Sequence, residues 1–289
     1  MSVSEPFLPT EAASVPRAPI TEIGRVPSGG RGLLALEYRK LFGFRSFQVG
    51  CLVAFLLPVL LSVAPDGELA KVIGTNLFLV SGWQVPGLAL YIVMQFALPL
   101  LVSVTCAELV GGEVAWGTLA PLLLRPVSRT RVISAKLFVA ISYPLILLAV
   151  TALGGLVAGA RFGLGSFAGG TGLGAGLFTG AGLMTPAMAA GELARGFLIA
   201  GLTLAPIAAL AILFGVVFLN TAAAALTTVA LILLMRLLVV FPGITPFLLT
   251  SHLDAYAPGR HAVSSLVLLL IYTVGASVAT IVAFERKDI

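Results

Sequence analysis

The residues best placed to act on another protein lie between Glu108 and Lys136, in the sequence ELVGGEVAWGTLAPLLLRPVSRTRVISAK. At about 100° per residue, a helix through this segment gathers its apolar side chains on one face, namely Ala115, Trp116, Leu119, Leu122 and Leu123. Its other face carries Glu113, Gly117, Thr118, Pro121 and Arg125. This spacing predicts a short amphipathic helix at the membrane edge, with a charged face to which a soluble partner protein can bind. Under the alternative interpretation, the helix only links two membrane spans.

Glycine and proline mark both ends of this segment. Gly111 and Gly112 can break the preceding helix, because glycine is a poor helix former. Pro126 forces a helix end before the next span, because its ring clashes with the preceding turn. Ser128 or Thr130 then stands where a side chain can cap the following helix. We therefore expect the amphipathic helix to be separate from the spans on either side.

Polar residues inside the apolar stretches are few, and two of them are candidates for a substrate pathway. Arg236 lies near the outer end of its stretch. There it either extends to the membrane surface or faces a cavity and meets an anionic group of a substrate. Gln95 is the second candidate. No stretch carries Asp or Glu near its middle, which disfavours a transporter driven by protons or sodium.

Other patterns carry little chemistry. Residues 170–175 fit G-x-G-x-x-A, but no convincing strand-helix unit surrounds them, so we expect no nucleotide site. His252 and His261 do not have a standard zinc spacing, and we expect both to be solvated loop residues. Cys51 and Cys106 lie in apolar runs, where a free thiol packs as a small hydrophobic group. We predict no metal site and no catalytic residue.

The composition defines the elements that must position these residues. Of the 289 residues, 59% are hydrophobic and only 10% are charged, and the mean hydropathy is +1.10. Soluble domains carry about 25% charged residues, so this chain has too little polar surface for a water-exposed globule. These values predict an integral membrane protein and exclude a soluble enzyme, a disordered chain and a disulfide-stabilised secreted domain. The net charge of +5 is better explained by loop charges than by nucleic-acid binding.

Charged residues divide the chain into stretches long enough to cross a membrane core, which needs about 20 apolar residues. The uncharged stretch 196–235 is too long for one span, and Asn220-Thr221 offers a turn near its middle. Residues 162–191 are rich in glycine, so we expect an extra-membrane or re-entrant loop there. We therefore predict an all-α membrane protein with six transmembrane helices, at 47–64, 85–107, 133–160, 196–219, 222–241 and 262–284.

The N-terminal part of the chain divides into a tail and a short helix. Residues 1–32 contain five prolines and no apolar core, so we expect a disordered cytoplasmic tail before a membrane domain over 33–289. From Leu33 to Arg45 an apolar stripe, which Glu37 interrupts, predicts a helix lying in the membrane interface. A basic flank beside the first span is the alternative.

The distribution of basic residues predicts the orientation of the spans. With six spans and the N-terminus inside the cell, twelve lysines and arginines lie on the cytoplasmic side and four on the opposite side. Basic residues accumulate in the cytoplasmic loops of membrane proteins. We therefore expect both termini to be cytoplasmic.

These features together resemble the permease subunits of ABC transporters of the type-2 exporter class. The residues that carry the resemblance are Gly112-Glu113, Gly117-Thr118-Leu119, Leu122-Leu123, Arg125-Pro126-Val127-Ser128-Arg129 and Lys136, with the ending Phe284–Ile289. Six spans, cytoplasmic termini and an interfacial helix before the first span are similar to this family as well. The resemblance covers residues 33–289 and leaves the tail aside.

The resemblance implies that residues 113–124 form a coupling helix that docks in a groove of a separate ATPase subunit. It assigns coupling to Glu108, Glu113, Gly117, Thr118, Arg125, Pro126 and Arg129. It implies no cofactor on this chain, because ATP and magnesium would be bound by the ATP-binding cassette partner. In agreement, the sequence contains no G-x-x-x-x-G-K-[ST] motif. Two permease chains and two ATPase chains would form the exporter in the lipid of the inner (plasma) membrane.

Two other classes of function stay open at this point. A membrane-embedded enzyme would need His, Asp, Glu or Cys side chains that converge at one membrane depth. A non-transporting membrane anchor would share the exposed helix but would need no moving spans. We expect a transport subunit rather than an enzyme, and no nucleic-acid partner.

Overall fold

The computed structural model describes residues 30–63, 81–117, 128–168, 177–178, 182–257 and 262–287. The helices are α1 (Gly30–Gly43), α2 (Arg45–Val63), α4 (Gln84–Gln95), α5 (Ala97–Ala115), α7 (Arg129–Gly159), α8 (Pro186–Phe218), α9 (Thr221–Leu238) and α10 (Ala262–Glu285). Short elements in the described residues are the 3-10 turns η1 (Ala160–Phe162), η2 (Thr245–Phe247) and η3 (Leu249–His252) and the paired strands β1 (Phe167–Ala168) and β2 (Leu183–Met184). The predicted all-α fold is confirmed.

Among the described residues, six helices are long and apolar enough to cross a membrane, and they are α2, α5, α7, α8, α9 and α10. This number agrees with the predicted six spans, with α4 preceding α5 in the second span. The faces of α2, α9 and α10 carry large exposed apolar side chains, for example Leu60, Leu226 and Leu270. Such faces are stable against lipid or another apolar protein surface and unstable in water.

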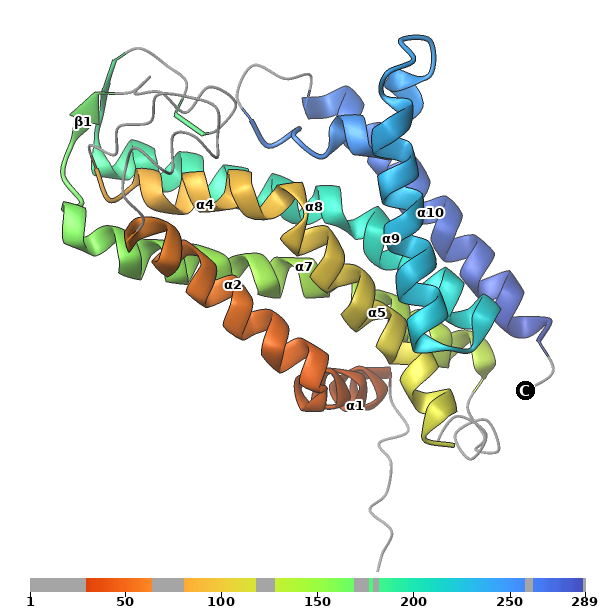
Figure 1. The fold of residues 1–289 in the computed structure, drawn as a ribbon. Coiled ribbons are helices and arrows are strands. Elements are labelled where there is room, and N and C mark those ends of the chain that lie inside the picture. The colour runs from red at the N-terminus through yellow and green to blue at the C-terminus, as the bar shows by residue number, and fades with distance from the viewer. Residues whose placement is uncertain are drawn as a thin grey trace, which may run out of the picture.

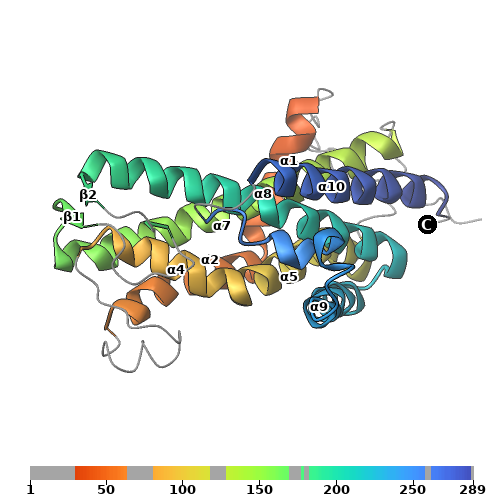
Figure 2. The same cartoon turned by 90° about the horizontal axis from the view of Figure 1, so that it is seen from above.

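The central helix of the bundle is α8, which packs against α5, α7, α9 and α10. Helices α2 and α4 pack on α7, and α1 lies crosswise to the long helices (Figures 1 and 2). One end of the bundle holds α1, the end of α5, the start of α7 and the end of α10, and we name it the α1 end. The opposite end holds η2, η3 and the two strands, and we name it the η3 end (Figure 1).

The helix of the fourth span begins earlier than predicted. A charged residue marks where the apolar membrane core ends, but the helix itself can continue past it. Helix α8 starts at Pro186 and not at residue 196, and its 33 residues extend to about 50 Å. Thr185 caps it by accepting a hydrogen bond from the Met188 amide. Glu192 and Arg195 form an exposed ion pair at 3.0 Å on its surface, so the helix passes through them at little cost.

Helix α5 runs through Gly111 and Gly112, so the predicted break at these glycines is wrong. Gly111 serves helix packing instead, because a Cβ atom there would lie 2.5 Å from the backbone nitrogen of Thr221. The missing side chain lets α5 approach the start of α9. The helix ends at Ala115, and Gly117 follows with φ of +65°, a conformation that glycine adopts without strain.

The turn between the fourth and fifth spans agrees with the prediction at Asn220-Thr221. Leu219 adopts the left-handed conformation with φ of 52° and ends α8. The Asn220 side chain then caps α9 by accepting a hydrogen bond from the Ala223 amide at 3.0 Å. A polar cap at this point lets the chain reverse direction without leaving the amides of the new helix unpaired.

The second span is broken at Phe96, between α4 and α5. Pro99 accounts for the break. It has no N–H to donate to the carbonyl of Gln95 four residues earlier, and its ring clashes with that carbonyl. The break places Gln95 at the last position of α4, inside the bundle's apolar length. Irregular backbone at such a depth is tolerated where it is covered by protein or lines a cavity.

Candidate functional site

Four charged side chains from three helices meet at the α1 end of the bundle, and we name them the charge cluster. Glu37 and Lys40 come from α1, Glu113 from the last turn of α5, and Lys136 from the first part of α7. The Nζ atom of Lys136 lies 2.9 Å from Glu37 Oε2 and 2.8 Å from Glu113 Oε1. The Nζ atom of Lys40 lies 2.9 Å from Glu37 Oε1 and 2.6 Å from Glu113 Oε1.

The charge cluster is largely closed to solvent. The side chains of Glu37, Lys136 and Glu113 are 0%, 1% and 4% exposed, whereas that of Lys40 is 38% exposed. Lys136 also donates a hydrogen bond to the carbonyl of Leu109 at 3.0 Å. Buried charges are tolerated only when they are paired and hydrogen-bonded. Each of α1, α5 and α7 therefore depends on the other two at this point.

The partly exposed member of the cluster remains charged. Burial by itself lowers the pKa of Lys40, but the carboxylates of Glu37 and Glu113 outweigh this effect, and the pKa lies above its usual value of 10.5. Two ammonium groups therefore face two carboxylates, and the four charges balance.

This arrangement corrects the predicted position of Glu113. The helical pattern predicted Glu113 on the exposed face of a separate helix, yet it is buried in α5 and paired inside the protein. A residue so placed can transmit a movement, but it offers little surface to a partner. Most of the predicted helix 113–124 lies outside the described residues, and so do the coupling residues Thr118, Arg125 and Pro126.

Sequence reasoning missed the role of Glu37, although a signal was present. Glu37 interrupts the apolar stripe of α1, and it appeared there as a flaw in the pattern. Its side chain is 0% exposed because α1 packs on α7 and meets Lys136. An acidic residue inside an otherwise apolar stripe needs a cationic partner if the stripe is buried. Tyr38, on the same helix, adds a hydrogen bond of 2.6 Å to Ser142 of α7.

The segment 118–127 is bordered along the chain by α5 and α7, and each of these helices is bonded to another part of the fold. On the α5 side, Ser46 of α2 donates a hydrogen bond to Glu108, seven residues before the helix ends at Ala115. At the border with α7, Arg129 donates to the carbonyl of Lys287 at 2.9 Å, which links the start of α7 to the residues after α10. The described coupling residues Glu108, Glu113, Gly117 and Arg129 thus lie in α5, directly after it, or at the start of α7, all at the α1 end.

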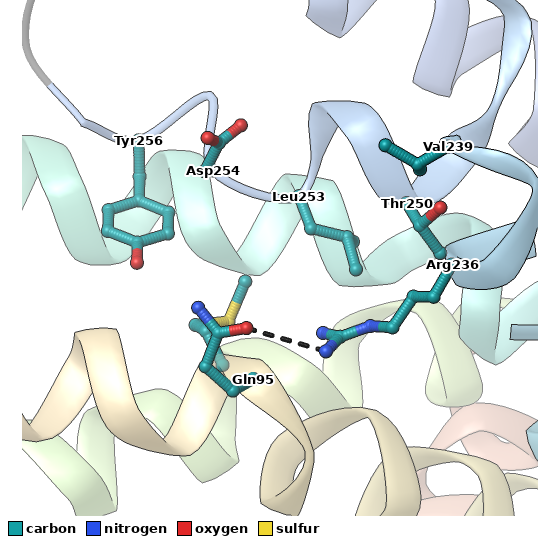
Figure 3. A pocket seen from close by; sticks show the side chains of 8 residues that line it. Gln95, Arg236, Val239, Thr250, Leu253, Asp254 and Tyr256 are labelled. Carbon is teal, nitrogen blue, oxygen red and sulfur yellow. Dashed lines mark hydrogen bonds between the residues drawn. The ribbon is translucent and has the colours of Figure 1, made fainter. Parts of the chain in front are cut away.

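The two candidate substrate-pathway residues meet in a cavity of about 320 Å³ on the η3 side of the break in the second span. Arg236, from the last turn of α9, donates a hydrogen bond to Gln95 Oε1 at 3.4 Å (Figure 3). Its guanidinium carbon also lies 4.6 Å from the centroid of the Phe96 ring. The remaining walls come from α4, from the residue after α9, from η3 and from the residues after η3: Met94, Val239, Thr250, Leu253, Asp254 and Tyr256.

Arg236 lines this cavity, as the second of its two interpretations requires. The carboxylate of Asp254 points away from the guanidinium (Figure 3). Among the described residues, no carboxylate lies within 4.0 Å of Arg236. Burial raises the pKa of Tyr256, and Asp254 raises it further, so this wall presents a neutral phenol.

His252 lies in η3 between the last two spans and is half-buried, and its ring makes two hydrogen bonds within the fold. Its Nε2 atom donates to the carbonyl of Pro246 at 2.9 Å, and its Nδ1 atom lies 2.9 Å from Ser265 Oγ. The ring thereby links η3 to α10. His261 lies outside the described residues. In the described part of the chain, no three His, Cys, Asp or Glu residues form a group that could hold a metal ion.

Comparison with known proteins identifies the family of the chain. No curated protein matches the sequence. The family model described as ABC-2 family transporter protein matches residues 33–212, which is more than half of the chain. The matched region begins in α1 and ends in α8, so it contains the whole charge cluster, both borders of the segment 118–127 and Gln95. With six apolar helices and this match, the chain belongs to the ABC-2 family of transporter membrane proteins.

Proposed function

We propose that this permease is moved by a separate ATP-binding cassette ATPase subunit and exports its substrate. The observation that supports coupling is that the charge cluster joins the last turn of α5 to the first part of α7, the two helices that the segment 118–127 connects along the chain. Most of the predicted docking helix 113–124 falls in that segment. That segment would dock on the ATPase subunit, and Glu113 would transmit the resulting movement of α5 to α1 and α7.

The contacts at the two borders support a mechanical path. A displacement of the segment 118–127 acts on the end of α5 and on the start of α7 at the same time. The charge cluster joins both helices to α1, and Arg129 joins α7 to the residues after α10. Because helices and their buried ion pairs are stiff, a push at the α1 end is carried as a rigid-body movement toward the η3 end.

The assembly that follows from this proposal contains more than one chain. A second permease chain, identical or not, would face one of the apolar surfaces on α2, α9 or α10, and membrane lipid would cover the rest. ATP and magnesium would be bound by the two ATPase subunits, and no nucleic acid takes part. We place the complex in the inner (plasma) membrane with both termini of this chain in the cytoplasm.

The test separates docking from transmission. The chain is purified in mild detergent from its own host, and the ATPase activity of the co-purifying protein is measured. Arg125→Glu reverses a charge in the proposed docking helix and should reduce co-purification at least tenfold. Glu113→Gln keeps the side-chain shape of a buried residue, so it should leave co-purification unchanged while ATP hydrolysis becomes insensitive to the permease. Arg195→Glu, at an exposed position near the start of α8 at the η3 end, is the matched control and should change neither readout.

Two results would refute the proposal. The first is a permease that purifies without any nucleotide-hydrolysing partner. The second is an Arg125→Glu variant that retains both partner and activity. A Glu113→Gln variant that loses the partner but keeps its fold would assign Glu113 to docking and remove the transmission role.

A further inference from the structure

The cavity at the break in the second span has the features of a ligand site. Its volume of about 320 Å³ is at the lower end of the range for small-molecule sites, which is roughly 300–1,000 Å³. Discontinuous membrane helices often provide substrate sites, because the broken helix frees polar groups at membrane depth. Here Pro99 causes the break and Gln95 stands at it.

The charge in this cavity is incompletely compensated. A guanidinium has five N–H donors, and the hydrogen bond from Arg236 to Gln95 is long, at 3.4 Å. The Phe96 ring at 4.6 Å attracts a cation, but it accepts no strong hydrogen bond and carries no net charge. A cation in apolar surroundings is costly unless an anion meets it.

The amide of Gln95 is the second polar group at this place. Its Oε1 atom accepts the hydrogen bond from Arg236, and both side chains line the cavity. Asp254 also lines the cavity, but it directs its carboxylate away from Arg236 (Figure 3).

The surroundings of the polar groups are apolar. Met94, Val239 and Leu253 line the cavity, and Phe96, whose ring lies under the guanidinium, is 63% exposed on the surface of the bundle. A small soluble anion would gain nothing from these side chains. An anionic group attached to a hydrocarbon tail would place its charge on Arg236 and its tail along them.

We propose that the cavity between Gln95 and Arg236 binds the phosphate or carboxylate group of an amphipathic molecule, with the apolar tail directed toward Phe96. That this ligand is the transported substrate rests on the proposed transport function, and the substrate class is then amphipathic anions. Such a molecule is either a membrane phospholipid or a single-chain solute, and the experiment distinguishes the two.

The experiment measures binding to the purified permease alone, without ATPase and without nucleotide, so its failure is independent of the coupling mechanism. Lysophosphatidic acid and a monoacylglycerol with the same chain are titrated into the protein in dodecyl maltoside and counted by native mass spectrometry. Charge-assisted hydrogen bonds predict about tenfold to hundredfold tighter binding of the phosphate-bearing lipid. Arg236→Gln should abolish this difference. Arg195→Gln, which removes an exposed arginine from the same end of the bundle, should preserve it.

A second variant covers the case in which Arg236→Gln does not fold. Gln95→Leu keeps the charge but removes the amide that orients the guanidinium, and it should weaken lysophosphatidic acid by about threefold to tenfold. Equal binding of both lipids to the unaltered protein, or an unchanged preference in a folded Arg236→Gln protein, would overturn the proposal. Displacement of lysophosphatidic acid by equimolar inorganic phosphate would overturn the proposal that the ligand is amphipathic, because it would show that the hydrocarbon tail adds nothing to binding. Diacyl phosphatidic acid that binds equally well identifies a membrane lipid, and its exclusion identifies a single-chain solute.

Discussion

The charge cluster allows a quantitative test, because one of its ammonium groups can be removed while the stem of its side chain is kept. Lys136→Met keeps an unbranched stem up to Cε and removes the ammonium group that contacts Glu37, Glu113 and the Leu109 carbonyl. Two buried carboxylates then share Lys40, whose side chain is 38% exposed. Breaking a buried ion pair by removing one partner costs about 3–5 kcal/mol. We therefore expect a loss of unfolding free energy of that size.

The assay is thermal unfolding in dodecyl maltoside, followed by circular dichroism. At roughly 2–4 °C per kcal/mol, the melting temperature of Lys136→Met should fall by about 6–20 °C. The double variant Glu37→Gln with Lys136→Met leaves one carboxylate facing one ammonium group. It should regain about 1–3 kcal/mol relative to Lys136→Met, because the two positions are in direct contact and their effects are not additive.

A matched control tests whether burial is the cause. Arg195→Met removes one partner of the exposed Arg195–Glu192 ion pair. The contact distance in this pair is 3.0 Å, against 2.9 Å in the Lys136–Glu37 pair, but its two side chains are 42% and 39% exposed. Its effect should stay within about 1 kcal/mol. If Lys136→Met melts at the wild-type temperature, or if Arg195→Met is equally damaging, the reasoning from burial is refuted.

Three further predictions follow from local geometry. Gly111→Ala should destabilise the protein by about 1–3 kcal/mol, because the added Cβ meets the Thr221 backbone. Gly275→Ala on α10 adds a Cβ that meets no atom within 4 Å, so it should stabilise the protein by up to about 1 kcal/mol. Equal melting temperatures for the two variants would contradict this prediction. Asn220→Ala removes the cap of α9 and should lower the free energy of unfolding by about 0.5–2 kcal/mol. Asn220→Asp retains a cap and is the control. An unchanged melting temperature in Asn220→Ala would show that the cap is dispensable. Because the pKa of Lys40 is raised in the folded protein, its contribution is fully present below pH 10.5 and is lost as the pH rises through the folded value. The melting-temperature difference between wild type and Lys40→Met should therefore be constant from pH 7 to 10 and shrink above 10.5, and a difference that shrinks already below pH 10 would contradict the sign.

Composition and hydrophobic patterning determine the class of this protein and the number of its spans. Apolar length is a property of the chain itself, since a stretch of sufficient hydropathy is stable across a membrane regardless of its neighbours. The turn at Asn220 was predictable for the same reason, because a cap acts on amides only a few residues away. The start of α8 at Pro186 was not predictable in this way, because an exposed ion pair such as Glu192 with Arg195 limits the membrane core without ending a helix.

The roles of individual residues depend on which helices become neighbours. Gly111 looked like a helix breaker and instead allows α9 to approach, and Glu37 looked like a flaw and instead pairs with Lys136 at a distance of 99 positions along the chain. Gln95 and Arg236 were separate polar residues in the sequence, 141 positions apart, and they line one cavity in the structure. Hydropathy and caps act within a few residues, so the sequence alone reveals them. A buried charge or an open cavity depends on distances between helices, and only tertiary packing sets those distances.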